Sequence, residues 1–126
     1  MKTNKFFFVS LLVFLYCTMS CKEKPVDEVK YPIMLGEHTY TGKIVGKGNP
    51  CTTEPCLPCT VLWLETTSAY YVLSINSHWF CGRPIIVDDI EYSEGDEVEI
   101  TGIVTKWQDI YSKEYFNLEI KSIKKL

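Results

Sequence analysis

Four cysteines are the residues whose type and spacing are best suited to chemistry. Three lie together in the segment CTTEPCLPC, at Cys51, Cys56 and Cys59, and the fourth is Cys81. An even set of thiols usually pairs in an oxidising compartment, so we expect all four to form structural disulfides. The same thiols could instead supply a redox pair at Cys56 and Cys59, or a zinc site of four thiolates.

Each alternative lacks part of the pattern that it needs. A redox pair with this spacing works at the N-terminus of a helix in a βαβ unit, and no such unit is visible in the sequence. A zinc site would combine the closely spaced Cys56 and Cys59 with a second close pair, which is missing. The cysteines therefore predict neither a metal ion nor any other cofactor.

The cysteine pairing has three solutions. If a hairpin turn is centred between residues 67 and 68, Cys81 falls opposite the loop that carries the other three thiols. This register favours a bridge between Cys56 and Cys81, which leaves Cys51 to pair with Cys59. The other two pairings stay open, because register errors of about two residues are ordinary in such a prediction.

Few other residues suggest a site. The two histidines, His38 and His78, have no second ligand at helical spacing. The seven carboxylates between Asp88 and Glu99 lack the ligand spacing of a calcium loop, and we interpret them as a solvated turn. Trp107 and Tyr111 fall on a predicted connection where aromatic rings could frame a groove, so they are the candidate ligand-binding residues.

The first twenty residues have the pattern of an export signal. Lys2 and Lys5 precede an apolar run from Phe6 to Met19, which is too short for a transmembrane helix of ~20 apolar residues. A basic start, a short apolar segment and the small residue Ser20 are typical of a secretory signal peptide, predicted here over residues 1–20.

The end of this leader resembles the lipobox of bacterial lipoproteins. The matching residues are Thr18, Met19, Ser20 and Cys21. The resemblance implies cleavage before Cys21 and acylation of that cysteine, which would anchor the chain to a membrane through lipid. Lys22 follows where an aspartate would signal retention in the inner membrane, so the resemblance implies the outer membrane of a diderm bacterium.

The residues after Cys21 are predicted to form a short tether over residues 21–35. The segment from Lys22 to Lys30 is charged, poor in apolar residues and contains Pro25. Without Lys2 and Lys5, 11 of the 13 basic residues remain against 16 acidic ones, a net charge of −5. This charge argues against nucleic acid as a partner and against electrostatic attachment to an anionic membrane.

Residues 36–126 are predicted to form one all-β domain. The segment from Glu97 to Thr105 alternates apolar and polar residues with a period of two, and Gly102 lies within it. Glycines inside strands often mark the sharp bends of a small barrel, where a side chain would collide. Five principal strands are expected, at residues 40–46, 60–65, 70–75, 97–105 and 116–120.

The domain, over roughly residues 36–126, resembles an OB-fold. The residues that carry the resemblance are the turn at Gly95 and Asp96, the strand VEITGIV around Gly102, and the last strand YFNLEIKSI. The resemblance implies a small five-stranded OB-like barrel, here stapled by disulfides. The helix that usually precedes the fourth strand is not evident in residues 76–92, so a β-sandwich or another barrel topology stays open.

These observations favour a lipid-anchored module of the cell envelope that binds an envelope protein, a glycan or a small ligand and is not an enzyme. The alternatives are a thiol-disulfide active protein that uses Cys56 and Cys59, and a domain organised by a zinc-thiolate site.

Overall fold

The computed structural model describes residues 29–56 and 58–126. The predicted signal peptide, Cys21 and the first part of the tether lie outside the described residues. Tyr31–Leu126 forms one compact unit. The described residues form strands, turns and loops, so the prediction of an all-β domain is confirmed. No helix among them is long and apolar enough to cross a membrane.

Eight strands make up this unit. Their bounds are β1 Ile33–Gly48, β2 Thr60–Glu65, β3 Tyr70–Ile75, β4 His78–Trp79, β5 Ile85–Val87, β6 Ile90–Tyr92, β7 Glu97–Gln108 and β8 Glu114–Lys125. β2 and β3 coincide with their predicted ranges. β1, β7 and β8 extend beyond theirs, because each pairs with a neighbour along its whole length and the pairing carries the strand past the alternating segment.

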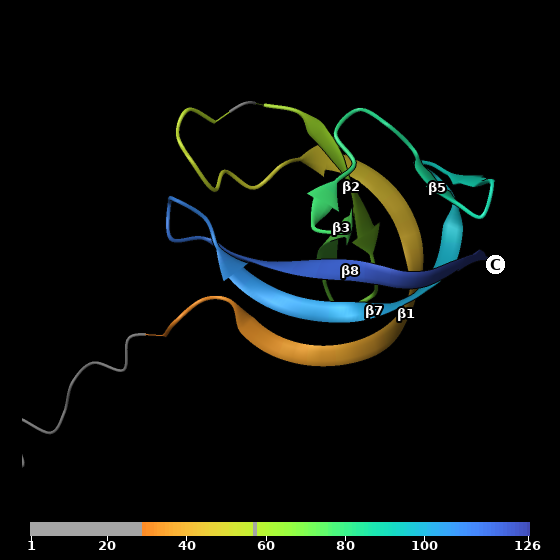
Figure 1. The fold of residues 1–126 in the computed structure, drawn as a ribbon, viewed down its shortest axis with the longest axis horizontal. Coiled ribbons are helices and arrows are strands. Elements are labelled where there is room, and N and C mark those ends of the chain that lie inside the picture. The colour runs from red at the N-terminus through yellow and green to blue at the C-terminus, as the bar shows by residue number, and fades with distance from the viewer. Residues whose placement is uncertain (1–28, 57) are drawn as a thin grey trace, which may run out of the picture. The chain divides into compact units, whose positions relative to one another are not determined.

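Six strands form one mixed sheet in the order β2-β1-β7-β8-β3-β4, and β5 and β6 form a separate hairpin. Because β2 also pairs with β3, the pairings of five strands close into a ring (Figure 1). β3 and β8 run parallel, whereas the other pairs of the ring are antiparallel. The segment between β3 and β7 holds β4, β5 and β6, and no helix.

Two glycines allow the long strands to curve around the ring. β1 passes from β7 to β2 at Lys43, which pairs with both strands. A Cβ atom at the preceding Gly42 would overlap the backbone carbonyl of Glu65. Gly102 follows a register shift between β7 and β8, and a Cβ atom there would overlap the carbonyl of Glu119. The prediction that a side chain at 102 would collide with its surroundings is therefore confirmed.

The strands bury residues on both of their faces. Alternating residues such as Leu64, Leu73 and Leu118 belong to the main core. The other face of β2 and β3 carries a second cluster of buried apolar residues: Val61, Trp63 and Val72. Partly buried side chains from other parts of the chain cover this second cluster. This second face, rather than the main core, is where the candidate site lies.

Candidate ligand-binding site

Two disulfides are formed, Cys51–Cys56 and Cys59–Cys81. The favoured pairing of Cys56 with Cys81 and of Cys51 with Cys59 is therefore wrong, although all four cysteines are bonded. Cys56 and Cys59 belong to different bridges, so the pair that the redox alternative needs is not formed. The thiolates that the zinc alternative needs are consumed in the bridges.

The reason for the different pairing is a chain reversal. The register between β2 and β3 is the expected one, with Trp63 opposite Val72. The chain then turns back at residues 76 and 77, and β4 pairs with the end of β3. Cys81 therefore does not continue along β3 but returns beside Val61, where it reaches Cys59.

The two disulfides join different parts of the chain. Cys59 packs against the second apolar cluster, and the backbone N–H of Gly82 donates to the carbonyl of Thr60 at 2.9 Å. The Cys59–Cys81 bridge thus ties the start of β2 to the segment after β4. The Cys51–Cys56 bridge lies within the β1–β2 loop, residues 49–59, and closes a short ring of chain there.

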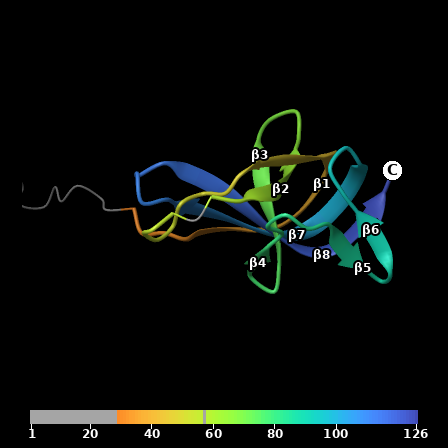
Figure 2. The ribbon, with the colours of Figure 1, turned by 90° about the horizontal axis from the view of Figure 1, so that it is seen from above.

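The β1–β2 loop meets the β7–β8 loop, residues 109–113, at one end of the molecule (Figures 1 and 2). The N–H of Ile110 donates to the carbonyl of Cys51 at 2.9 Å. The carboxylate of Asp109 accepts from the backbone N–H groups of Tyr111 and Lys113 at 2.9 and 2.8 Å, which holds the β7–β8 loop in shape. We call the hydrogen bond between Ile110 and Cys51 the loop bridge.

A first hollow of about 510 Å³ lies beside the loop bridge. Its lining includes the aromatic rings of Trp63, Tyr70, Tyr111 and Tyr115 and the ammonium group of Lys47. The Lys47 ammonium lies 3.7 Å from the centroid of the Tyr70 ring. The indole N–H of Trp63 is buried and has no hydrogen-bond partner among the described residues. The first hollow therefore combines aromatic faces with a cation.

A second hollow of about 640 Å³ also borders the β1–β2 loop, through Thr52. Its aromatic residues are Trp79, Trp107 and Tyr115, and its polar residues include Ser74, Asn117 and Glu119. Tyr115 lines both hollows, so they share one wall. Aromatic rings with a few convergent polar groups are the usual composition of a small-ligand site.

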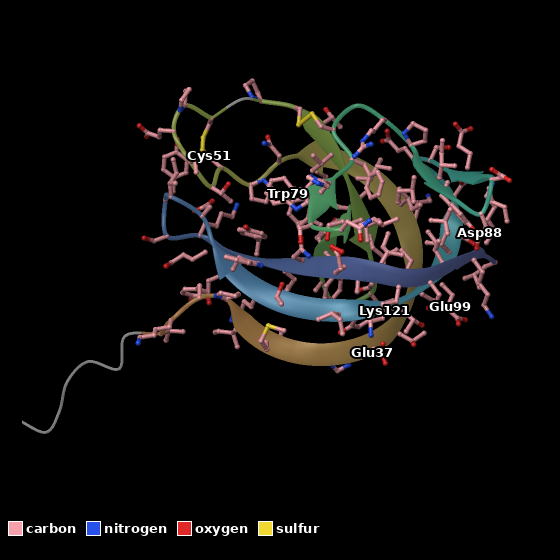
Figure 3. The ribbon with its side chains drawn as sticks, in the orientation of Figure 1. Glu37, Cys51, Trp79, Asp88, Glu99 and Lys121 are labelled. Atoms are coloured by element: carbon pink, nitrogen blue, oxygen red, sulfur yellow. A yellow bond between two sulfur atoms is a disulfide. The ribbon has the colours of Figure 1, made fainter. Side chains whose placement is uncertain are left out.

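The polar residues of the second hollow form a connected network. The Trp79 indole N–H donates to the Asn117 side-chain oxygen at 3.1 Å, and the Asn117 amide donates to the Ser74 hydroxyl at 3.0 Å. Ser74 in turn donates to a Glu119 carboxylate oxygen at 2.8 Å. Trp79, which contributes the indole N–H to this network, is labelled in Figure 3. The network fixes the side chains and so preorganises the surface that a ligand would meet.

The Tyr115 phenol is neutral over the physiological range. Burial, and secondarily the negative charge of Asp109, raises the pKa of Tyr115 to about 12. A neutral phenol can both donate and accept a hydrogen bond. Its ring meets Trp79 edge to face, with the centroids 6.3 Å apart. Tyr115 therefore offers a polar atom and an ordered ring at the boundary between the two hollows.

The structure separates the two predicted ligand-binding residues. Tyr111 lines the first hollow and Trp107 lines the second. Trp63, Trp79 and Tyr115 were not predicted as site residues. The signal for Tyr115 was present in β8, where Tyr115, Asn117 and Glu119 alternate with the residues of the core, but no local pattern indicated that a loop would lie over that face.

The remaining sequence candidates form no additional site. The His38 ring nitrogen Nε2 lies 2.7 Å from the backbone oxygen of Leu35, and His78 lines the second hollow. In the part of the chain that the structure describes, no group of three or more His, Cys, Asp or Glu residues is placed to hold a metal ion.

Comparison with known proteins brings no relative: no family model, no curated protein and no solved structure matches this chain.

Proposed function

We propose that this protein is a non-catalytic binding module of the cell envelope, anchored by lipid at Cys21, that holds a short glycan in the two hollows that border the β1–β2 loop and share Tyr115. The observation that carries the proposal is the lining of the hollows. Aromatic faces, an amide, a carboxylate and a lysine converge there on a surface that the disulfide-closed loop borders.

The order of strands in the ring supports an OB-like barrel. The chain runs through β1, β2 and β3 as neighbours, and β8 lies between β3 and β7. OB-folds are five-stranded Greek-key barrels that bind oligosaccharides or oligonucleotides on the face of strands 2 and 3, between the loops that follow strands 1 and 4. The corresponding loops here are the β1–β2 and β7–β8 loops, which border the hollows.

A glycan fits these hollows better than the other ligands of such a barrel. Sugar rings present flat apolar faces to aromatic side chains and hydroxyl groups to amides and carboxylates, and the second hollow contains both kinds of partner. An oligonucleotide would need a basic groove, whereas the mature chain carries a net charge of −5, from 11 basic and 16 acidic residues.

A binding role also agrees with the burial and hydrogen bonding of the polar side chains in the second hollow. The Ser74 side chain is buried and its hydroxyl already donates to Glu119, so it is not exposed as a nucleophile. A catalytic serine would instead be exposed to the substrate. Groups that are satisfied and fixed in this way are suited to recognising a ligand rather than transforming it.

The test is a nuclear magnetic resonance titration of the purified protein with defined oligosaccharides, namely cello-, xylo-, manno- and N-acetylglucosamine oligomers. The indole N–H signals of Trp63 and Trp79 report on the first and second hollows. We expect one oligomer class to shift both signals, and Tyr115→Ala to weaken its binding about tenfold, the effect of ~1.4 kcal/mol.

The matched control is Ile86→Ala, on an exposed position of β5 away from both hollows. This control should leave the affinity unchanged. If no oligomer shifts either indole signal, or if Tyr115→Ala binds as well as the control, the proposed glycan site is wrong. Mass spectrometry of the oligomer after incubation should find it intact, since a cleaved oligomer would contradict the non-catalytic role.

A further inference from the structure

Exposed apolar side chains gather at the end of the molecule where the chain enters the sheet. We call them the tether-end patch, and they are Met34, Leu35, Trp107, Ile110 and Tyr111. Met34 is 65% exposed and Tyr111 is 70% exposed. Such a concentration of large apolar groups on a small domain indicates an interaction surface.

The members of the patch are brought together by the pairing of β1 with β7. Met34 pairs with Thr105, and the Trp107 indole N–H donates to the Thr105 hydroxyl at 3.0 Å. Met34, Thr105 and Trp107 therefore lie on the same face of the β1–β7 pair. Ile110 and Tyr111 follow in the β7–β8 loop, which lies at the same end as the start of β1 (Figures 1 and 2).

The entry of the chain is attached to this same end. The Tyr31 hydroxyl donates to a Glu114 carboxylate oxygen at 2.6 Å, and the Lys106 ammonium pairs with the same carboxylate at 3.1 Å. These contacts hold Tyr31 against the first residue of β8. The contact with Tyr31 and the Lys106 cation both lower the pKa of Glu114, so its carboxylate stays ionised and the contacts persist at neutral pH.

The opposite end of the molecule has a different character. The acidic residues from Asp88 to Glu99 lie in the turn between β5 and β6, on β6, in the turn after β6 and at the start of β7. In Figure 3, Asp88 lies at the end of the molecule away from Cys51 and the loop bridge. One end of the domain thus carries the tether-end patch. The other end is rich in carboxylates, although Lys124 and Lys125 pair with Glu99 and Asp96 and the side chains of Ile86 and Ile90 are exposed there.

We propose that the tether-end patch docks on the surface of the lipid bilayer and sets the orientation of the domain. Trp and Tyr favour the interface between water and hydrocarbon, and the aliphatic members add apolar area. Anionic lipids repel the acidic end, which favours the same orientation. The chain makes ten residue-to-residue steps from Cys21 to Tyr31, with nine residues between them, and these span at most ~36 Å. An anchor at Cys21 therefore keeps the patch within reach of the bilayer.

This proposal uses the anchor at Cys21 from the proposed function, so its test replaces that anchor. A hexahistidine tag takes the place of residues 1–21 and binds vesicles of phosphatidylcholine and phosphatidylglycerol that contain a nickel-chelating lipid. The shortened chain keeps every strand, the core and both disulfides, because all of them lie in the compact unit from Tyr31 to Leu126. A failure of natural lipidation therefore cannot affect the result.

The measurement is tryptophan fluorescence with and without bromine atoms on the lipid chains, which quench only rings close to the hydrocarbon. We expect quenching that Trp107→Phe abolishes, since Trp107 is the exposed tryptophan of the patch. Met34→Asp and Ile110→Asp should each lower the docked population about tenfold. Met34 lines neither hollow and takes no part in the loop bridge, so glycan binding should not change in Met34→Asp.

The matched control is Ile86→Asp, at an exposed apolar position of β5 on the acidic part of the molecule, and it should leave the quenching unchanged. The proposal is overturned if bromine does not quench the wild-type chain, or if Ile110→Asp behaves like the control. Dimerisation in solution that Met34→Asp abolishes, without any quenching on vesicles, would also overturn it and assign the patch to a second copy of the chain.

Discussion

The two disulfides should contribute unequal amounts to stability, although each has at least one cysteine in the β1–β2 loop. The perturbation is the paired replacement of Cys59 and Cys81 by serine, compared with the paired replacement of Cys51 and Cys56. Paired replacement leaves no free thiol to form a new bridge. Both variants remove one disulfide and add two hydroxyl groups, so each is the natural control for the other.

The expected magnitudes follow from the loops that the bridges close. Cys59 and Cys81 are 22 residues apart, and Cys51 and Cys56 are 5 apart. In the chain-entropy model, these separations correspond to losses of about 3.4 and about 2.1 kcal/mol in the free energy of unfolding. The difference should widen beyond ~1.3 kcal/mol, because Cys59 also packs against the second apolar cluster and its replacement by serine places a hydroxyl there.

Equilibrium unfolding in urea, followed by tryptophan fluorescence, measures both changes, since the free energy of unfolding falls linearly with urea. The denaturant slope should be compared with that of the wild-type protein, because removing a cross-link also changes the unfolded state. Peptide mapping of the wild-type protein without reduction should recover the two pairs as described. A loss for the Cys51 and Cys56 variant that equals or exceeds the loss for the Cys59 and Cys81 variant would refute the reasoning.

Three further outcomes are expected. Cys21→Ser should release the protein from membranes or leave its leader uncleaved, and label from fatty acid should disappear; a labelled, normally processed variant would contradict the lipid anchor. Gly102→Val should lower the free energy of unfolding by more than the ~1 kcal/mol that strand propensity spans, because its Cβ atom would overlap the carbonyl of Glu119; a change near zero in urea unfolding would contradict that close approach. The free energy of unfolding should fall as pH rises from 10 to 12. Burial raises the pKa of Tyr71 and of Tyr115 from 10.0 to about 12, and a hydrogen bond with Tyr40 also raises the pKa of Tyr71. Because these pKa values are higher in the folded state, the stabilisation is complete below pH 10 and is lost as the phenols ionise. Urea unfolding of the double Phe variant should show a shallower decline over this range, and an unchanged slope would contradict the assignment.

Several features of the fold follow from local sequence. The ranges of β2 and β3 were predicted correctly because both are short apolar strands bounded by polar turns. Their register was also predicted, since the short connection between them leaves little freedom, and the structure places Trp63 opposite Val72. Gly102 could be interpreted as a point of close approach because a glycine interrupts an otherwise regular alternation.

The candidate site could be predicted only in part, because its walls come from distant segments. The alternation in β8 places Tyr115 and Asn117 on one face, but this face becomes part of a site only where the β1–β2 loop approaches it. Trp79 joins the site because its indole reaches Asn117, which is 38 residues away in sequence. Contacts of this kind depend on the parallel pairing of β3 with β8, and no short-range pattern specifies that pairing.

The sequence by itself determined the β-class of the domain, the participation of all four cysteines in cross-links and the position of a strand bend at Gly102. These properties depend on residue type and on spacing within a single segment. The tertiary structure alone decided which cysteines pair, because a reversal at residues 76 and 77 returns Cys81 to Cys59. It also decided that the loops after β1 and β7 meet, since that contact requires strand pairings between residues far apart in the chain.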